Sequence, residues 1–156
     1  MSTVRTGLCA RDLMTPEPIC VTPSTTLREM VRLLGEHEIS GMPVTDVEGA
    51  VVGIVGIRDL VRRIVAGEDG LMPGSFQDLV AEQQGGEDVL ELEHLEMPHV
   101  EDLMVEDPLT VRPDEAVETV AGLMGEHRIH HVIVVDEERM PLGIITSLDV
   151  LTAVGG

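Results

Sequence analysis

The stretch Gly53–Asp59, which reads Gly-Ile-Val-Gly-Ile-Arg-Asp, returns 90 residues later as Gly143–Asp149, which reads Gly-Ile-Ile-Thr-Ser-Leu-Asp. The same ungapped offset relates other identical stretches: Asp12–Met14 with Asp102–Met104, and Gly35–His37 with Gly125–His127. Self-similarity at a fixed spacing is typical of a repeated structural unit. The chain is therefore expected to consist of two copies of one structural unit.

The apolar pattern predicts the order β-α-β-β-α in each copy. Short apolar runs predict strands, an apolar stripe at i, i+3, i+4 and i+7 predicts a helix, and two apolar runs around a polar turn predict a hairpin. In the first copy we expect Ile19–Val21, a helix with Ser24 as N-cap, Met42–Val44, Val51–Val55, and a helix from Asp59. In the second copy we expect Leu109–Val111, a helix with Asp114 as N-cap, Val132–Val135, Leu142–Ile145, and a helix from Asp149.

A unit of about 50 residues buries too little apolar surface to be stable alone. We therefore expect an α/β (α+β) fold in which two tandem β-α-β-β-α repeats pack together with pseudo-twofold symmetry. The boundaries are expected at 1–65 for the first repeat, 66–100 for an acidic insert containing glycine and proline, and 101–156 for the second repeat. The insert, with a short helix predicted at Ser75–Gln84, is either a partner-docking arm or lid, or a solvated connection between the repeats.

The stretch that ends in Asp149 has the chemistry to bind a sugar. Backbone N–H groups at a helix N-terminus attract phosphate or ribose oxygens, and a hydroxyl of Thr146 or Ser147 can donate or accept beside them. The carboxylate of Asp149 can accept hydrogen bonds from both hydroxyls of a ribose, whereas a phosphate alone would be repelled by it. The alternative is that Thr146 or Ser147 caps the helix and that Asp149 only favours its positive end.

Both copies resemble the CBS motif, which usually occurs in pairs called Bateman modules. The resemblance rests on Asp-Leu-Met-Thr-Pro from residue 12, Ile-Ser-Gly-Met-Pro-Val-Thr-Asp from residue 39, and the stretch Gly53–Asp59. It implies clefts between the repeats that bind AMP, ADP, ATP, S-adenosylmethionine, NAD or a related regulatory ligand. The family pattern Gly-x-x-Thr/Ser-x-x-Asp implies that Thr146 is the hydroxyl residue and Asp149 the ribose carboxylate.

In the first copy, Gly56 stands where the resemblance expects the hydroxyl, while Asp59 is kept. We therefore expect the first cleft to be empty or weaker, and binding to depend mainly on the second repeat. The resemblance also implies phosphate contacts from basic or imidazole groups, namely His130, His131, Arg58 and Arg128. The adenine is expected against backbone and small apolar groups around Leu109, Thr110 and Ile129.

The charge of the chain limits its partners. There are 29 acidic and 10 basic residues, a net charge of −19, and every basic residue is arginine. Such a field opposes binding to DNA, RNA or an anionic membrane. With so few cations, S-adenosylmethionine competes with AMP as the expected ligand and ATP is less attractive. No apolar run approaches the roughly 18 residues of a membrane span, and no apolar segment after Met1–Arg5 predicts a secretory signal, so we expect a cytoplasmic protein.

Neither metal binding nor catalysis is supported by sequence motifs. Adjacent residues on a strand point to opposite faces, which separates His130 from His131, and there is no Cys-x-x-Cys pair. Nucleophile-elbow, Walker and dinucleotide-binding motifs are also missing. We expect a stand-alone, non-enzymatic ligand sensor that needs no cofactor, with a homodimer implied by the resemblance and an unknown effector protein as its target. The alternative is a ligand-free scaffold for dimerisation or protein interaction.

Overall fold

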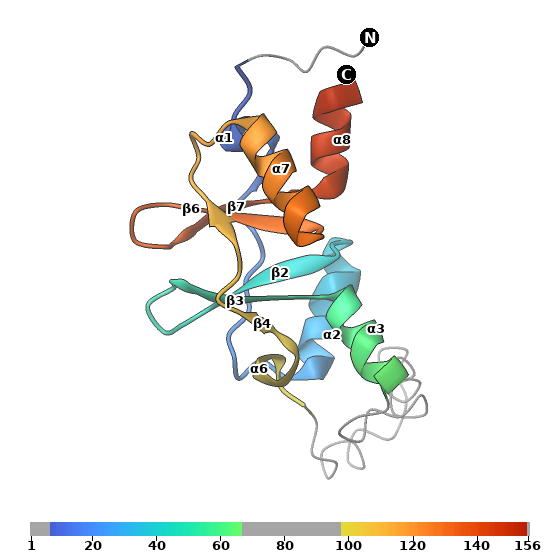
Figure 1. Ribbon diagram of the computed structural model, residues 1–156. Helices are drawn as coiled ribbons and strands as arrows, with labels where there is room; N and C mark the ends of the chain where they lie inside the picture. Colours follow the sequence, from blue (N-terminus) through green and yellow to red (C-terminus); the bar gives the residue numbers. More distant parts are fainter. Residues whose placement is uncertain (1–6, 67–97, 156) are drawn as a thin grey trace.

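The computed structural model describes residues 7–66 and 98–155, which contain both repeats. The helix predicted at Ser75–Gln84, with most of the insert 66–100, lies outside the described residues. Figure 1 shows two similar halves, with their sheets facing each other in the middle and their helices on the outer sides. The predicted α/β fold of two tandem repeats with pseudo-twofold packing is confirmed.

Each half contains the predicted helix–hairpin–helix. In the first repeat the elements are α2 (Leu27–His37), β2 (Gly41–Thr45), β3 (Val51–Gly56) and α3 (Ile57–Ala66). In the second repeat they are β5 (Thr110–Val111), α7 (Val117–His127), β6 (His131–Val135), β7 (Pro141–Thr146) and α8 (Ser147–Gly155). The first predicted strand of the first repeat is reduced to one parallel bridge between Val21 and Val44, which matches the Val111–Val134 pair of β5 and β6.

The N-terminal segment of each repeat packs on the other repeat. The first such segment contains α1 (Ala10–Leu13) and β1 (Thr15–Pro16), and β1 pairs antiparallel with β7 of the second repeat. The second contains α6 (Val100–Leu103) and β4 (Val105–Glu106), and β4 pairs antiparallel with β3 of the first repeat. The resulting strand orders are β1-β7-β6-β5 and β2-β3-β4. This exchange, visible in Figure 1, was not predicted.

The exchange completes both hydrophobic cores. Ala10 is fully buried in the core of the second repeat, and Val100 is fully buried in the core of the first. A third cluster joins the facing sheets through Val51, Ile133 and Val135. Because each half borrows core residues from the other, neither repeat is complete without its partner, as expected for units of this size.

The predicted N-caps Ser24 and Asp114 are wrong, because residues 22–25 and 112–115 form a turn before each helix. The N–H of Thr25 donates to the carbonyl of Thr22 at 3.0 Å, and the N–H of Glu115 donates to the carbonyl of Arg112 at 3.1 Å. The first helix is instead capped by the Thr26 hydroxyl, which accepts from the N–H of Glu29 at 3.2 Å. The second starts after residue 116, an alanine, with no side-chain cap.

Candidate functional site

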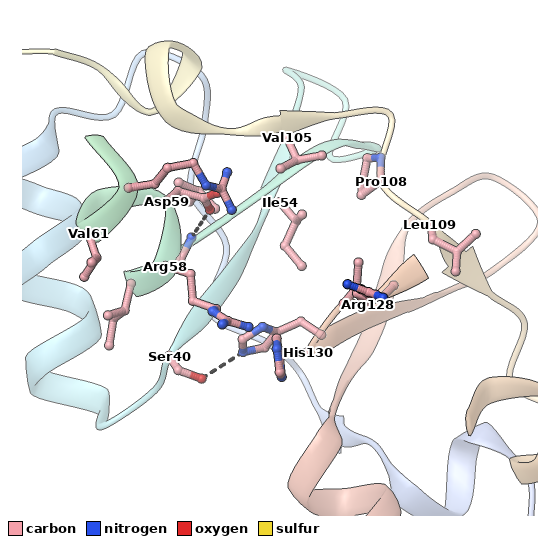
Figure 2. Close-up of a pocket in the computed structure, with 16 residues that line it drawn as sticks. Ser40, Ile54, Arg58, Asp59, Val61, Val105, Pro108, Leu109, Arg128 and His130 are labelled. Carbon is pink, nitrogen blue, oxygen red and sulfur yellow. Dashed lines mark hydrogen bonds and ion pairs between the residues drawn. The ribbon is translucent and has the colours of Figure 1, made fainter. Parts of the chain in front are cut away.

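A cleft of about 590 Å³ lies between the two repeats and is lined by both. The first repeat contributes the end of β3 and the first turns of α3, together with Ser40 before β2. The second half contributes β4, the segment leading into β5, and the residues between α7 and β6. Figure 2 shows these side chains around the cleft; the lining residues outside β3 and α3 are Ser40, Val105, Pro108, Leu109, Arg128, Ile129, His130 and His131.

Asp59 is the acidic group of this cleft. Its Oδ2 accepts a hydrogen bond of 2.9 Å from the backbone N–H of Gly56, which fixes the carboxylate at the start of α3. Its Oδ1 lies 3.5 Å from Nη1 of Arg62. Burial raises the pKa of Asp59 above its ordinary value, opposed by the Gly56 N–H and then by Arg62. One carboxylate oxygen is thus held by the backbone, and the other is placed to accept from a ligand hydroxyl.

The second repeat repeats this arrangement and adds the hydroxyl. The N–H of Thr146 donates to Oδ2 of Asp149 at 2.7 Å, and the N–H of Asp149 donates to Oγ1 of Thr146 at 3.2 Å. Thr146 therefore does cap the start of α8, as the capping alternative expected. This cap leaves the hydroxyl proton of Thr146 free to be donated, and Oδ1 of Asp149 makes no hydrogen bond with the described residues, so capping and sugar binding are compatible.

A steric cause explains why the first repeat has glycine at the hydroxyl position. Gly56 faces Gly41 across the β2–β3 pair, whereas the matching pair in the second repeat is Thr146 with His131. A Cβ atom at position 56 would lie 2.4 Å from the carbonyl oxygen of Ser40. The first repeat cannot hold a threonine there without a backbone shift.

His131 lies where the two repeats meet. Its Nε2 is 2.8 Å from the Ser40 hydroxyl, and a Cβ on Gly41 would come within 3.1 Å of its ring. Burial lowers the pKa of His131 below 6.5, as do His130 and Arg58, while Asp149 opposes this shift. The imidazole is therefore mainly neutral at pH 7.

This lowered pKa predicts a pH-dependent stability. As pH falls below about 6.5, the unfolded chain takes up a proton that folded His131 resists, so the free energy of unfolding should decrease between pH 7.5 and pH 5. Urea unfolding at the two pH values measures the change, which should be smaller in His131→Gln. A decrease of the same size in that variant would assign the effect to other groups.

The structure brings together some of the predicted site residues and separates others. Arg58, Asp59, Ile129, His130 and His131 share the cleft, and Leu109 joins them. Four other predicted residues are not among those lining it: Thr110, Ser147, Thr146 and Asp149. Leu109 and Ile129, expected beside the Asp149 site, lie instead with Asp59. Leu109 follows the exchanged segment directly, whereas Ile129 lies between α7 and β6 of the second repeat.

Some lining residues were missed by sequence reasoning. Val105 and Pro108 enter the cleft through the segment exchange, and Ser40 enters through its contact with His131. Arg62 had a usable signal, since residues three apart on a helix lie on one face, which places it beside Asp59. Val105, Pro108 and Ser40 could not be assigned to this cleft from the repeat alone, because their place depends on how the two repeats pack.

The chemistry of the described residues favours an organic ligand. Within the ranges 7–66 and 98–155, no group of three or more His, Cys, Asp or Glu side chains is arranged to hold a metal ion. Over the same ranges, no helix is both long enough and apolar enough to cross a bilayer. A carboxylate, three arginines and two imidazoles around a cleft with apolar walls provide hydrogen-bond acceptors, hydrogen-bond donors and apolar contacts for a small molecule.

Comparisons with known proteins agree with the repeat. The CBS domain model matches residues 10–66 and 100–156. The chain is 29% identical over 150 residues to the uncharacterized protein MJ1426 of Methanocaldococcus jannaschii, covering 92% of this chain and 89% of that one. It spans less than a quarter of other relatives, including a homoserine O-acetyltransferase from Methanocorpusculum labreanum, 28% identical over 142 residues.

Two solved structures have the same fold over nearly the whole chain. The CBS domain pair of protein MJ0100, in complex with 5'-methylthioadenosine and S-adenosyl-L-methionine, has a TM-score of 0.71 and 25% identity, covering 96% of this chain and 97% of that one. CBSX2 from Arabidopsis thaliana, in complex with AMP, has a TM-score of 0.69 and 30% identity, covering 94% and 96%. The chain belongs to the CBS domain family, and its two repeats form a CBS domain pair.

Proposed function

We propose that this CBS pair is a regulatory module that binds an adenosyl ligand between its repeats and performs no chemistry itself. The observation that carries the proposal is the cleft of about 590 Å³ in which Asp59 of the first repeat faces residues of the second. The complexes of CBSX2 with AMP and of MJ0100 with S-adenosyl-L-methionine support the ligand class, which also includes ADP, ATP and NAD.

Each part of an adenosyl ligand has a matching group in this cleft. The ribose diol would donate to the carboxylate of Asp59, whose position is set by the Gly56 N–H. The adenine would lie against the apolar walls near Ile54, Leu109 and Ile129. By the 90-residue offset, Thr146 and Asp149 would hold a ribose in the same way, with Ser147 beside them. Thr110 lies on β5, the edge strand of the same sheet. That the second repeat binds more tightly stays a prediction.

Binding would regulate by changing how the repeats are held together. A ligand that contacts both repeats is bound best by one relative arrangement of the two sheets, and therefore increases the population of that arrangement. The facing sheets meet through Val51, Ile133 and Val135, so a small rotation there would be transmitted to the outer helices. An effector protein that recognises one arrangement would then respond to the ligand.

A homodimer is part of this proposal, and its support is an apolar surface on α3 and α8. Val61, Val65, Leu148 and Leu151 are each more than half exposed, and both helices lie on the same side of the molecule in Figure 1. A second copy presenting the same surface would cover these side chains. We expect the double variant Val61→Glu/Leu151→Glu to sediment as a monomer while the wild type sediments as a dimer. A wild-type monomer at micromolar concentration would contradict this.

A thermal-shift panel separates the sensor from a ligand-free scaffold. AMP, ADP, ATP, S-adenosylmethionine and NAD are each added to the wild type and to the double variant Asp59→Asn/Asp149→Asn. A ligand at 100 times its Kd adds about 2.7 kcal/mol of stability, which raises the midpoint by roughly 5–10 °C. A rise in the wild type that is lost in the variant supports the sensor. No rise with any of the five ligands favours the scaffold.

A further inference from the structure

The scarce positive charge of the chain is concentrated at the Asp59 cleft. Only 10 of 156 residues are basic, and three of them, Arg58, Arg62 and Arg128, line this one cleft together with His130 and His131. Asp59 is the one carboxylate among the described lining residues. In a protein of net charge −19, the formal charge of the residues that line this cleft, three arginines against one carboxylate, is therefore opposite in sign to that of the whole molecule.

Two of these arginines are available to a ligand. Several arginines elsewhere are held by carboxylates, as Arg32 is by Glu36 at 2.8 Å. By contrast, the side chains of Arg58 and Arg128 make no hydrogen bond or ion pair with any described residue. Figure 2 shows them on the two sides of the cleft, Arg58 from α3 and Arg128 from the second repeat. Unpaired guanidinium groups on facing walls are suited to bind a phosphate.

The equivalent positions around Asp149 carry no arginine. At the 90-residue offset, Arg58 corresponds to Leu148, Arg62 to Thr152, and Arg128 to Glu38, and the two histidines correspond to Ser40 and Gly41. The offset is structural as well as sequential, because β1 pairs with β7 in the register in which β4 pairs with β3. Glu38 and Arg128 are also matching C-caps, with φ of 52° and 53°.

We propose that the two pseudo-equivalent sites select ligands by charge. The Asp59 site takes an adenosyl ligand that carries a phosphate, and the Asp149 site takes an adenosyl ligand without net negative charge, such as a nucleoside or an adenosyl sulfonium. This inference rests on the proposed function. A phosphate beside Asp149 would meet the carboxylates of Asp149 and Glu38 with no arginine at the matching positions, whereas at Asp59 the arginines offset the single carboxylate.

The inference predicts opposite specificities for matched variants. Calorimetric titrations of the full chain use AMP and S-adenosylmethionine as probes. The double variant Arg58→Gln/Arg128→Gly should bind AMP roughly tenfold or more weakly and S-adenosylmethionine as the wild type does. Glycine at position 128 also suits the left-handed C-cap conformation, so this variant is expected to fold. Asp149→Asn should weaken S-adenosylmethionine and leave AMP unchanged.

The control is Arg32→Gln/Arg112→Gln, which also removes two positive charges but away from the cleft. Its affinity for AMP should equal that of the wild type. An equal loss of AMP affinity in the control would reduce the effect to net charge and overturn charge selection. Equal weakening of both ligands by Arg58→Gln/Arg128→Gly, or none, would also overturn it while leaving the proposed function intact. Failure of both ligands to bind the wild type would overturn the proposed function itself.

Discussion

Replacing Asp59 by alanine is expected to weaken AMP binding by about 1.5–3 kcal/mol, since each ribose hydrogen bond to a charged acceptor contributes that much. The reason is geometric: Oδ2 of Asp59 is fixed by the Gly56 N–H, which leaves Oδ1, 3.5 Å from Nη1 of Arg62, to accept from the ribose. Isothermal titration with AMP measures the loss. Asp149→Ala should change AMP affinity much less. The sequence motif alone predicts the opposite, because it places binding mainly in the second repeat.

The control for this variant keeps the hydrogen bond at the start of α3. Asp59→Ala also removes the acceptor for the Gly56 N–H, which costs about 1 kcal/mol of stability. Asp59→Asn retains an oxygen there and removes the ionisable carboxyl, whose pKa is raised by burial. It should therefore fold as well as the wild type and still bind AMP weakly. If Asp59→Asn bound AMP as tightly as the wild type, Asp59 would not be the ribose acceptor.

Gly56→Thr, which would restore the family pattern in the first repeat, is expected to destabilise the protein rather than improve the site. Its Cβ would lie 2.4 Å from the Ser40 carbonyl oxygen and 3.2 Å from Cα of Gly41, and backbone atoms of a paired strand move only at a cost. Overpacking of this kind lowers the free energy of unfolding by about 1–3 kcal/mol. Urea unfolding followed by circular dichroism measures it.

The mirror substitution provides the comparison. Thr146→Gly removes a hydroxyl that accepts from the Asp149 N–H at 3.2 Å, and should cost about 1 kcal/mol through loss of the cap. The two changes exchange the same residue types at matched positions, so a larger loss for Gly56→Thr isolates the steric contribution. A stable Gly56→Thr protein that bound ligand more tightly would show that Ser40 can move away from the added Cβ.

Local sequence patterns predicted the strands and helices well. The continuous apolar run Val132–Val135 lies within β6, and the turn at Asp46–Gly49 joins β2 to β3 as expected. The N-caps were misplaced because hydroxyl residues also stabilise turns: Ser24 contacts Thr22 at 3.2 Å instead of capping α2. Propensity alone does not distinguish these two uses of a serine.

The segment exchange was not predictable in the same way. Nothing local distinguishes an α1 that packs on its own repeat from one that packs on the other, because Ala10 is buried by an apolar core in either case. The matching close approaches, of Met14 to Gly143 and of Met104 to Gly53, are visible only in three dimensions. The exchange is what brings Val105, and Leu109 after it, beside Asp59.

Net charge describes the cleft less well than the residues of the cleft do. The value of −19 belongs to the chain as a whole, and screening limits the reach of surface charges to about 8–10 Å at physiological ionic strength. Which arginines share one cleft, and with which carboxylate, depends on how the two repeats pack and was not predicted from the sequence.

The most direct measurement is a crystal structure of the protein with AMP. We expect density for AMP between the repeats, with its ribose hydroxyls within hydrogen-bonding distance of Asp59, its adenine against Ile129 and its phosphate near Arg58 and Arg128. Density for AMP on an outer surface, touching residues of only one repeat, would contradict a ligand site shared by the two halves of the chain.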